Sequence, residues 1–402
     1  MLAACSRDSP HGAGSDATAQ DAAASDAADD AGGPPPPRPF DAGHRADAAL
    51  QDAEVDAEPI EVRCTEAGAE QTDGLELVAS DGLLEAFTVR AQDDAVFATV
   101  GADLGGGLLH RVVDGQLERF GEAVDEVDAL HVAGDELFVA ISRDDDPGVP
   151  LVVAKLDATT GAREDLATDA ALREARALAV EGDWVYCAAD KATDPPGGRV
   201  FRAPRAGGAS ELISELPAMF LPEGARFAED SLRVRGALLV YIGRVNDFSA
   251  VFRGPSERMA GASLISGVPA MDGLPAGLPT DVGVELDEHA TYVAFAHNAT
   301  WTGPQGITRI PHDEARGDAL FETGTQQILG LTSDAESLYW MMRNREGTTS
   351  LLRGSKSGDA PRELATGFHW TRGLAVTDRY VYFVLSDCPR GDGVSLVRIP
   401  KR

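Results

Sequence analysis

The C-terminal stretch "SLVRIPKR", Ser395 to Arg402, decides the fold of this protein. It has the apolar pattern of a β-strand and ends abruptly. Closely similar segments occur six times earlier in the chain, and each of those is followed by one more strand. The last copy therefore lacks a partner strand, which has to come from elsewhere in the sequence.

An aromatic residue inside an apolar run marks each copy of a longer repeat. The seven copies recur at intervals of 41 to 55 residues, a period typical of the blades of a β-propeller. The marker residues are Phe97, Phe138, Tyr186, Tyr241, Tyr292, Tyr339 and Tyr382.

Each copy predicts four strands. An aliphatic residue about eight positions before the aromatic marks a first strand, and the apolar second strand follows a short Gly/Asp hairpin. The third strands align on a basic residue, and a more polar fourth strand follows in six copies. The aligned bases are Arg111, Lys155, Arg202, Arg253, Arg309, Arg353 and Arg398.

The missing fourth strand of the last copy is found near the N-terminus. The segment "GLELVASDG", Gly74 to Gly82, matches fourth strands such as "RELATG" and precedes the first complete repeat. We therefore predict an all-β fold, a seven-bladed β-propeller of four-stranded antiparallel blades. An N-terminal strand completes the last blade and closes the ring, which removes two exposed sheet edges.

The repeat "GRVFRAPRAGGASELI", Gly198 to Ile213, resembles those of envelope-associated β-propellers of the TolB-like and NHL-like kind. The resemblance covers about residues 74–402 and implies the architecture. It implies no particular ligand, because such rings host many unrelated functions.

Residues 6–63 differ sharply in composition from the repeats. From Ser6 to Ile60 there are twelve Asp or Glu and three Lys or Arg, embedded in Ala, Gly, Pro and Ser. So little apolar surface predicts a disordered linker. The expected organisation is a short head at 1–5, this linker at 6–63 and the propeller at 64–402.

The tetrapeptide Leu2-Ala3-Ala4-Cys5 at the head resembles the lipobox of bacterial lipoproteins. The resemblance implies lipidation of Cys5, and Ser6 after it favours the outer membrane. A signal peptide with an apolar region should precede the motif, yet only four residues do. Either the true start lies upstream, or the match is accidental. Lipidation predicts a location in the cell envelope, on the periplasmic side of the outer membrane or at the cell surface.

Three further cysteines remain. Cys187 lies in an apolar second strand and is expected to be a buried, inert thiol. Cys64 precedes the strand that closes the last blade and Cys388 lies in that blade, so a disulfide between them is predicted, with two free thiols as the alternative.

The sequence contains none of the common motifs of catalysis, metal binding or nucleotide binding, so no catalytic residue, metal site or cofactor is predicted. The net charge of −31 argues against nucleic acid and against direct binding to anionic lipid. The loops between second and third strands share one face and form a candidate binding surface. Its candidate residues are Asp145, Lys191, Asp194, Asn246, Asp247, His297, Trp301, Arg343, Arg345 and Asp392.

Two interpretations of function follow. The first is a non-enzymatic, lipid-anchored and monomeric propeller that acts as a binding or scaffold module, with an envelope protein, peptide or glycan bound through one face. The alternative is a propeller hydrolase or lyase that acts on glycan or peptide. Its catalytic groups would converge from several blades, and a His or paired carboxylates with perturbed pKa values at the channel would favour it. A purely structural envelope component is a third possibility.

Overall fold

The computed structural model describes the chain from residue 58 to residue 401 with gaps. The gaps are residues 63, 66–67, 70–73, 82–84, 93–94, 102–106, 114–115, 122–123, 125, 143–148, 192–196, 217–225, 229, 246–247, 258–262, 265–281, 296–304, 315–316, 325, 369 and 387–393. Lipidation of Cys5, most of the linker and Cys388 lie outside the described residues. The described part of the chain contains no apolar helix of membrane-spanning length.

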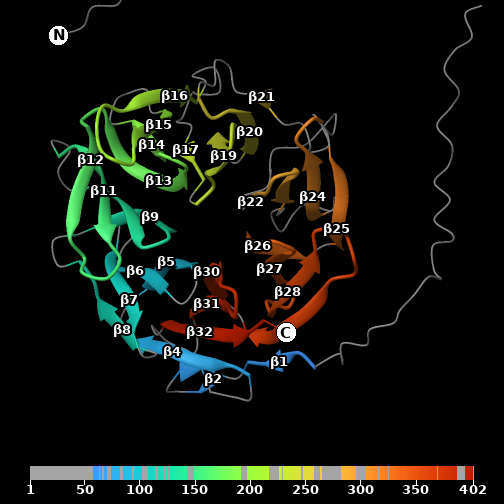
Figure 1. Cartoon of the computed structure of the whole chain (residues 1–402). Helices are drawn as coiled ribbons and strands as arrows, with labels where there is room; N and C mark the ends of the chain where they lie inside the picture. Colours follow the sequence, from blue (N-terminus) through green and yellow to red (C-terminus); the bar gives the residue numbers. More distant parts are fainter. Residues whose placement is uncertain are drawn as a thin grey trace, which may run out of the picture. The chain divides into compact units, whose positions relative to one another are not determined.

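Seven antiparallel sheets stand side by side around a central channel, as predicted (Figure 1). The first strands of successive blades contact one another around the channel. Blade 1 has β5 (Glu85–Gln92), β6 (Ala95–Gly101), β7 (Leu108–Val113) and β8 (Gln116–Arg119). Blade 2 has β9 (Val127–Ala133), β10 (Glu136–Ile141), β11 (Leu151–Asp157) and β12 (Arg163–Asp169), and blade 3 has β13 (Leu172–Glu181), β14 (Trp184–Lys191), β15 (Gly198–Pro204) and β16 (Glu211–Glu215).

The remaining blades follow the same order. Blade 4 has β17 (Arg226–Phe227), β18 (Arg233–Arg235), β19 (Leu238–Val245), β20 (Phe248–Pro255) and β21 (Ser263–Leu264), and blade 5 has β22 (Val282–Leu286), β23 (Ala290–Phe295), β24 (Gln305–Pro311) and β25 (Asp318–Gly324). Blade 6 has β26 (Gln327–Ser333), β27 (Ser337–Arg343), β28 (Thr349–Ser355) and β29 (Arg362–Phe368), and blade 7 has β30 (Trp370–Val376), β31 (Tyr380–Ser386) and β32 (Val394–Pro400).

The second strands carry the core, which confirms the interpretation of the aromatic repeat. All seven marker aromatics are buried. Side chains on both faces of these strands are buried because each blade packs against two neighbours, and β10 is buried at its four central positions. Between blades 5 and 6, Trp340 stacks on Phe321 with ring centroids 5.0 Å apart. The core is thus a series of apolar layers between blades.

Strand β4 (Glu76–Asp81) completes blade 7, as the sequence predicted. It pairs antiparallel with β32, with Val394 opposite Asp81 and Arg398 opposite Glu76. The Arg398 guanidinium donates to Glu76 Oε2 with Nε at 2.6 Å. Val78 is 3% exposed and packs with Val384 and Leu396 of the same blade. The ring is therefore closed by segments about 320 residues apart in the sequence.

A second N-terminal strand, β1 (Ile60–Glu61), pairs parallel with β29 at the outer edge of blade 6. Ile60 and Val62 are buried in the apolar layer between blades 6 and 7. Both residues lie within 6–63, the range whose composition predicted a disordered linker. The ordered ring thus begins before Cys64, whose backbone lies in the short β2 (Cys64–Thr65), paired with β3 (Gly68–Ala69).

Blades 5 and 6 are joined by a contact of an Asp, a Tyr and a Lys, and blades 6 and 7 are joined by an equivalent contact. We call this contact the interblade latch. In blade 5, Asp287 accepts hydrogen bonds from the backbone N–H groups of His289 (2.8 Å) and Ala290 (2.9 Å) and from the Tyr292 hydroxyl (2.9 Å). Lys356 of blade 6 lies 3.3 Å from the same carboxylate. The second latch, of blades 6 and 7, consists of Asp334, Tyr339 and Lys401.

The Asp287 latch predicts a pH-dependent contribution to stability. Burial opposes ionisation of this carboxyl, but its hydrogen bonds and Lys356 outweigh burial and lower the pKa from 3.8 to about 2. A depressed pKa stabilises the folded state above pH 4, and this contribution disappears as the pH falls toward 2. We expect Asp287→Asn to cost about 2 kcal/mol of unfolding free energy at pH 6. Urea unfolding at pH 6, 4 and 3 measures this, and the difference in unfolding free energy between wild type and variant should become smaller at each lower pH. A difference that stays constant with pH would contradict the prediction.

Candidate functional site

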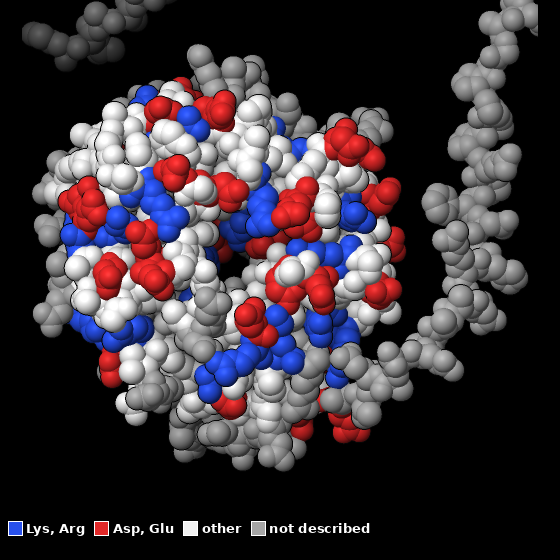
Figure 2. All heavy atoms as spheres, in the orientation of Figure 1, with Lys and Arg blue, Asp and Glu red and all other residues white. Residues whose placement is uncertain are grey.

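Charged side chains from several blades meet in the central channel. Figure 2 shows basic and acidic side chains around the opening in the middle of the ring. Most of the residues that interact with one another in the channel belong to the first strands of their blades, and Asp230 lies just before such a strand. We call this set the channel cluster: Arg90, His131, Asp230, Arg233, Glu285 and Ser333.

The cluster follows from the register of the repeat. Arg90, His131, Arg233 and Glu285 each come directly after the aliphatic residue that marks a first strand. The repeat therefore places them at one level of the channel. The residue directly after each aliphatic marker was the sequence signal for this site, and none of these residues is among the predicted candidates.

Blade 4 departs from the repeat, and the departure adds an acid. Its first strand is interrupted between β17 and β18, and Asp230 in this interruption has a left-handed backbone with φ of 54°. Asp and Asn adopt this conformation more readily than other residues with a side chain. The Asp230 N–H donates to the Arg176 carbonyl of blade 3 (2.8 Å). The Asp230 carboxylate is thereby held at the channel.

Arg90 and Asp230 connect opposite sides of the ring. The Arg90 guanidinium of blade 1 forms an ion pair with the Asp230 carboxylate of blade 4, although the two residues are 140 positions apart. Arg233 Nη1 also reaches Asp230, at 2.8 Å from its carbonyl oxygen and 3.4 Å from Oδ1. One carboxylate oxygen is thus shared by two guanidinium groups.

Glu285 of blade 5 neutralises the second guanidinium. Arg233 donates to Glu285 Oε1 from Nη2 (2.8 Å) and from Nε (3.1 Å). The Ser333 hydroxyl of blade 6 donates to the other oxygen, Oε2, at 3.1 Å. The Glu285 side chain is only 11% exposed. Such a carboxylate is costly to bury unless it is paired in this way.

The confined channel perturbs two of its titratable groups. Burial, followed by the nearby charges of Arg90 and Arg233, lowers the pKa of His131 to about 3, so the imidazole is neutral at pH 7. Burial and the charge of Arg233 lower the pKa of Arg90 to about 9, which leaves it protonated. Among the described residues, the channel cluster therefore contains two cations, Arg90 and Arg233, two acidic side chains, Asp230 and Glu285, and a neutral imidazole.

A second charged group lies at the other end of the first strands. Arg176 of blade 3 donates to Asp190 (2.9 Å) and to Glu174 (2.7 Å), and all three side chains are largely buried. Asp128 of blade 2 accepts a hydrogen bond from the Ala175 N–H at 3.1 Å. The Asp128 contact joins blade 2 to blade 3, and the Arg176 carbonyl accepts the hydrogen bond from the Asp230 N–H.

Most of the predicted loop candidates lie outside the described residues. These are Asp145, Asp194, Asn246, Asp247, His297, Trp301 and Asp392. Of the three that are described, Lys191 lies 3.3 Å from Glu215 of its own blade. Arg343 of blade 6 donates to the Gly347 carbonyl at 3.4 Å, and Arg345 is exposed. Lys191 thus lies in blade 3, and Arg343 and Arg345 lie at the turn between β27 and β28 of blade 6.

Other predicted features have clear positions. Cys187 is a buried free thiol, as expected, and burial raises the pKa of this thiol. Within the ranges that the structure describes, His, Cys, Asp and Glu side chains form no group of three suited to a metal ion.

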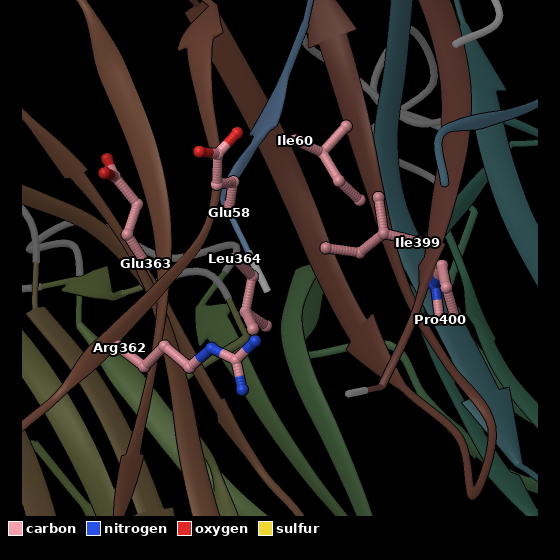
Figure 3. Close-up of a pocket in the computed structure, with 7 residues that line it drawn as sticks. All are labelled: Glu58, Ile60, Arg362, Glu363, Leu364, Ile399 and Pro400. Carbon is pink, nitrogen blue, oxygen red and sulfur yellow. The ribbon is translucent and has the colours of Figure 1, made fainter. Parts of the chain in front are cut away.

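A pocket beside β1 has room for about one water molecule. Figure 3 shows Ile60 and Ile399 in this pocket, with Glu58, Glu363 and Arg362 around them.

The channel cluster is therefore the strongest candidate site. Its guanidinium groups suit carboxylates and peptide carbonyls, and its carboxylates suit N–H groups and cations. His131 is a weak base at a pKa of about 3, so binding and orientation fit this cluster better than proton transfer.

No protein-family model matches the sequence, and no curated protein matches it. Solved structures do match in fold. A puromycin-hydrolyzing peptidase of Mycobacterium tuberculosis has a TM-score of 0.55 and 15% identity, over 79% of this chain and 52% of that one. The propeller domain of the Trilobed protease from Pyrococcus furiosus has a TM-score of 0.53 and 9% identity, over 79% and 95%. An acylaminoacyl peptidase of Pyrococcus horikoshii has a TM-score of 0.53 and 10% identity, over 78% and 50%.

The fold defines this chain as a seven-bladed β-propeller whose structural neighbours are propellers of peptidases. The chain spans about half the length of the first and third of those proteins. The Pyrococcus furiosus domain has an open velcro topology, whereas β4 closes the ring here. At these identities the similarity establishes the fold.

The first interpretation of function, a non-enzymatic binding or scaffold module, requires correction. The solved structures that resemble this chain belong to peptide-hydrolysing proteins. This finding agrees better with the alternative interpretation, a hydrolase that acts on peptide. The sequence favoured the first interpretation because side chains that converge from different blades leave no local motif.

Proposed function

We propose that this chain acts in peptide hydrolysis and that its channel binds the peptide. The observation that carries the proposal is the channel cluster, in which charged groups from opposite blades meet beside a neutral His131. The peptidase origin of the similar folds supports peptide as the substrate class. The cluster holds the peptide in place through charge-assisted hydrogen bonds.

Hydrolysis of a peptide panel by the full chain tests this function. The panel comprises blocked and unblocked fluorogenic peptides, including aminoacyl and prolyl amides. We expect turnover that falls about tenfold or more in Glu285→Gln, because the Arg233 guanidinium then loses its carboxylate partner. Glu288→Gln is the matched control, since Glu288 pairs with Arg235 on the exposed surface. Absence of cleavage, or cleavage that Glu285→Gln leaves unchanged, would contradict the proposal.

We also propose that the chain is a lipoprotein of the cell envelope, anchored through Cys5. The support is the Leu2–Cys5 tetrapeptide followed by a long Ala/Asp/Pro-rich segment before the ring. The resemblance to TolB-like and NHL-like propellers agrees with an envelope location. Expression with an added upstream signal peptide, followed by mass spectrometry of the N-terminal peptide, tests the anchor; an unmodified Cys5 that stays in the aqueous fraction would contradict it.

The predicted disulfide between Cys64 and Cys388 stays a proposal. Cys64 precedes the closing strand β4 in the sequence and Cys388 lies between strands β31 and β32 of blade 7, so a bond would connect segments more than 300 residues apart. Non-reducing peptide mapping of the purified protein tests it, and two unlinked thiols would end the idea. A monomeric ring with a peptide partner completes the proposed arrangement.

A further inference from the structure

We propose that Arg90 and Arg233 bind a carboxylate group of the peptide, which takes the place of Asp230 in the channel. This inference rests on the proposed function and names the chemistry that the channel selects. The ligand group is the C-terminal carboxylate of a peptide or an acidic side chain within it. Both present the same two oxygens to a guanidinium group.

The position of Asp230 marks where this carboxylate binds. Asp230 Oδ1 contacts Arg90 from blade 1 and lies 3.4 Å from Arg233 Nη1. A carboxylate between two guanidinium groups is a favourable arrangement, because each donates charge-assisted hydrogen bonds. Asp230 thus shows that the channel accommodates a carboxylate at this point, and an incoming one finds the same donors.

The two acids of the cluster differ in how firmly they are held. Glu285 accepts hydrogen bonds from two Arg233 nitrogens and from Ser333, and it is 11% exposed. Asp230 is 38% exposed. It stands in the short interruption of the first strand of blade 4, in a left-handed backbone conformation. Of the two acids, Asp230 is the one that solvent and a ligand reach.

Charge balance determines which ligands replace Asp230. The two guanidinium groups are matched by two carboxylates, and His131 is neutral. If Asp230 turns away, Arg90 is left in a confined channel without its anion, which is unfavourable. A carboxylate restores the balance, whereas an amide supplies a neutral oxygen only. The channel therefore discriminates between a free acid and its amide.

Calorimetric titration of the full chain with three short peptides tests the inference. The probes are N-acetyl-trialanine with a free C-terminus, its C-terminal amide, and N-acetyl-Ala-Glu-Ala amide. We expect the free acid to bind about tenfold or more tightly than the trialanine amide. Tighter binding of the Glu-containing amide than of the free acid assigns the site to acidic side chains, and the reverse order assigns it to the C-terminus.

Two variants separate the ligand carboxylate from Asp230. Asp230→Asn removes the competing charge and keeps a residue suited to the left-handed backbone, so we expect it to bind the free acid about tenfold more tightly than wild type. Arg90→Gln should abolish the difference between acid and amide. Arg235→Gln, on the exposed pair with Glu288, should change neither affinity. Thermal unfolding of each variant confirms that it is folded.

The results of these titrations separate the proposed carboxylate site from the proposed peptide-binding function. If the acid and the amide bind equally to wild type, the carboxylate site is wrong, while peptide binding stands. If none of the three peptides binds, both proposals fail. The comparison of acid with amide in wild type needs no variant, so a variant that fails to fold does not remove the test.

Discussion

Replacing Val78 by aspartate is expected to destabilise the ring by about 4 kcal/mol or more and to leave much of the protein aggregated. Val78 is 3% exposed in β4, the strand that closes blade 7. The aspartate places an unpaired charge in the apolar layer around Val384 and Leu396. It also weakens the one strand that joins the two ends of the ring, which exposes the edge of β32. Urea unfolding and size-exclusion chromatography measure the effect.

Leu212→Asp is the matched control for this experiment. Leu212 also lies in a fourth strand, β16 of blade 3, but it is 53% exposed. The same chemical change there should cost less than about 0.5 kcal/mol. Equal stability losses in the two variants would mean that closure by β4 contributes little.

Arg233→Ala is expected to cost about 3 kcal/mol of unfolding free energy. Arg233 holds Glu285 through two hydrogen bonds, and its removal leaves a largely buried carboxylate with only the Ser333 hydroxyl as partner from this cluster. Asp230 also loses one of its two guanidinium neighbours. Chemical denaturation at pH 7 measures the loss.

Arg235→Ala provides the control two residues further along the same strand. Its partner Glu288 is exposed, as Arg235 is, so the loss should stay below about 1 kcal/mol. The double variant Arg233→Met with Glu285→Met should recover most of the stability, because it removes both buried charges together. A double variant as unstable as Arg233→Ala would contradict the assignment of the loss to an unpaired Glu285.

The architecture was predictable because it repeats. Seven copies of the same strand pattern made each copy support the others, and the match of "GLELVASDG" to the fourth strands predicted that β4 pairs with β32. Burial of Cys187 followed from its place in an apolar second strand. The latch residues were visible too, since Asp287 and Asp334 each stand five positions before a marker tyrosine, although the partner lysines lie in the next blade.

The channel cluster was not predictable in the same way. Arg90 and Asp230 are 140 residues apart, and no local spacing indicates that they meet across the ring. In blade 4 the aliphatic residue that marks the first strand is Leu232, which stands nine positions before Tyr241 instead of eight. In the structure this irregularity is the interrupted strand that positions Asp230 and Arg233. A departure from a repeat therefore indicated the site better than the repeat itself.

The contact of Arg90 with Asp230 has a mechanical consequence. Neighbouring blades are joined by shared apolar layers, whereas this ion pair joins blades 1 and 4 across the channel. The ion pair opposes separation of these two blades, so we expect the width of the channel to depend on whether the ion pair is formed. A ligand that binds Arg90 or Asp230 in place of its partner would remove this connection between the two blades.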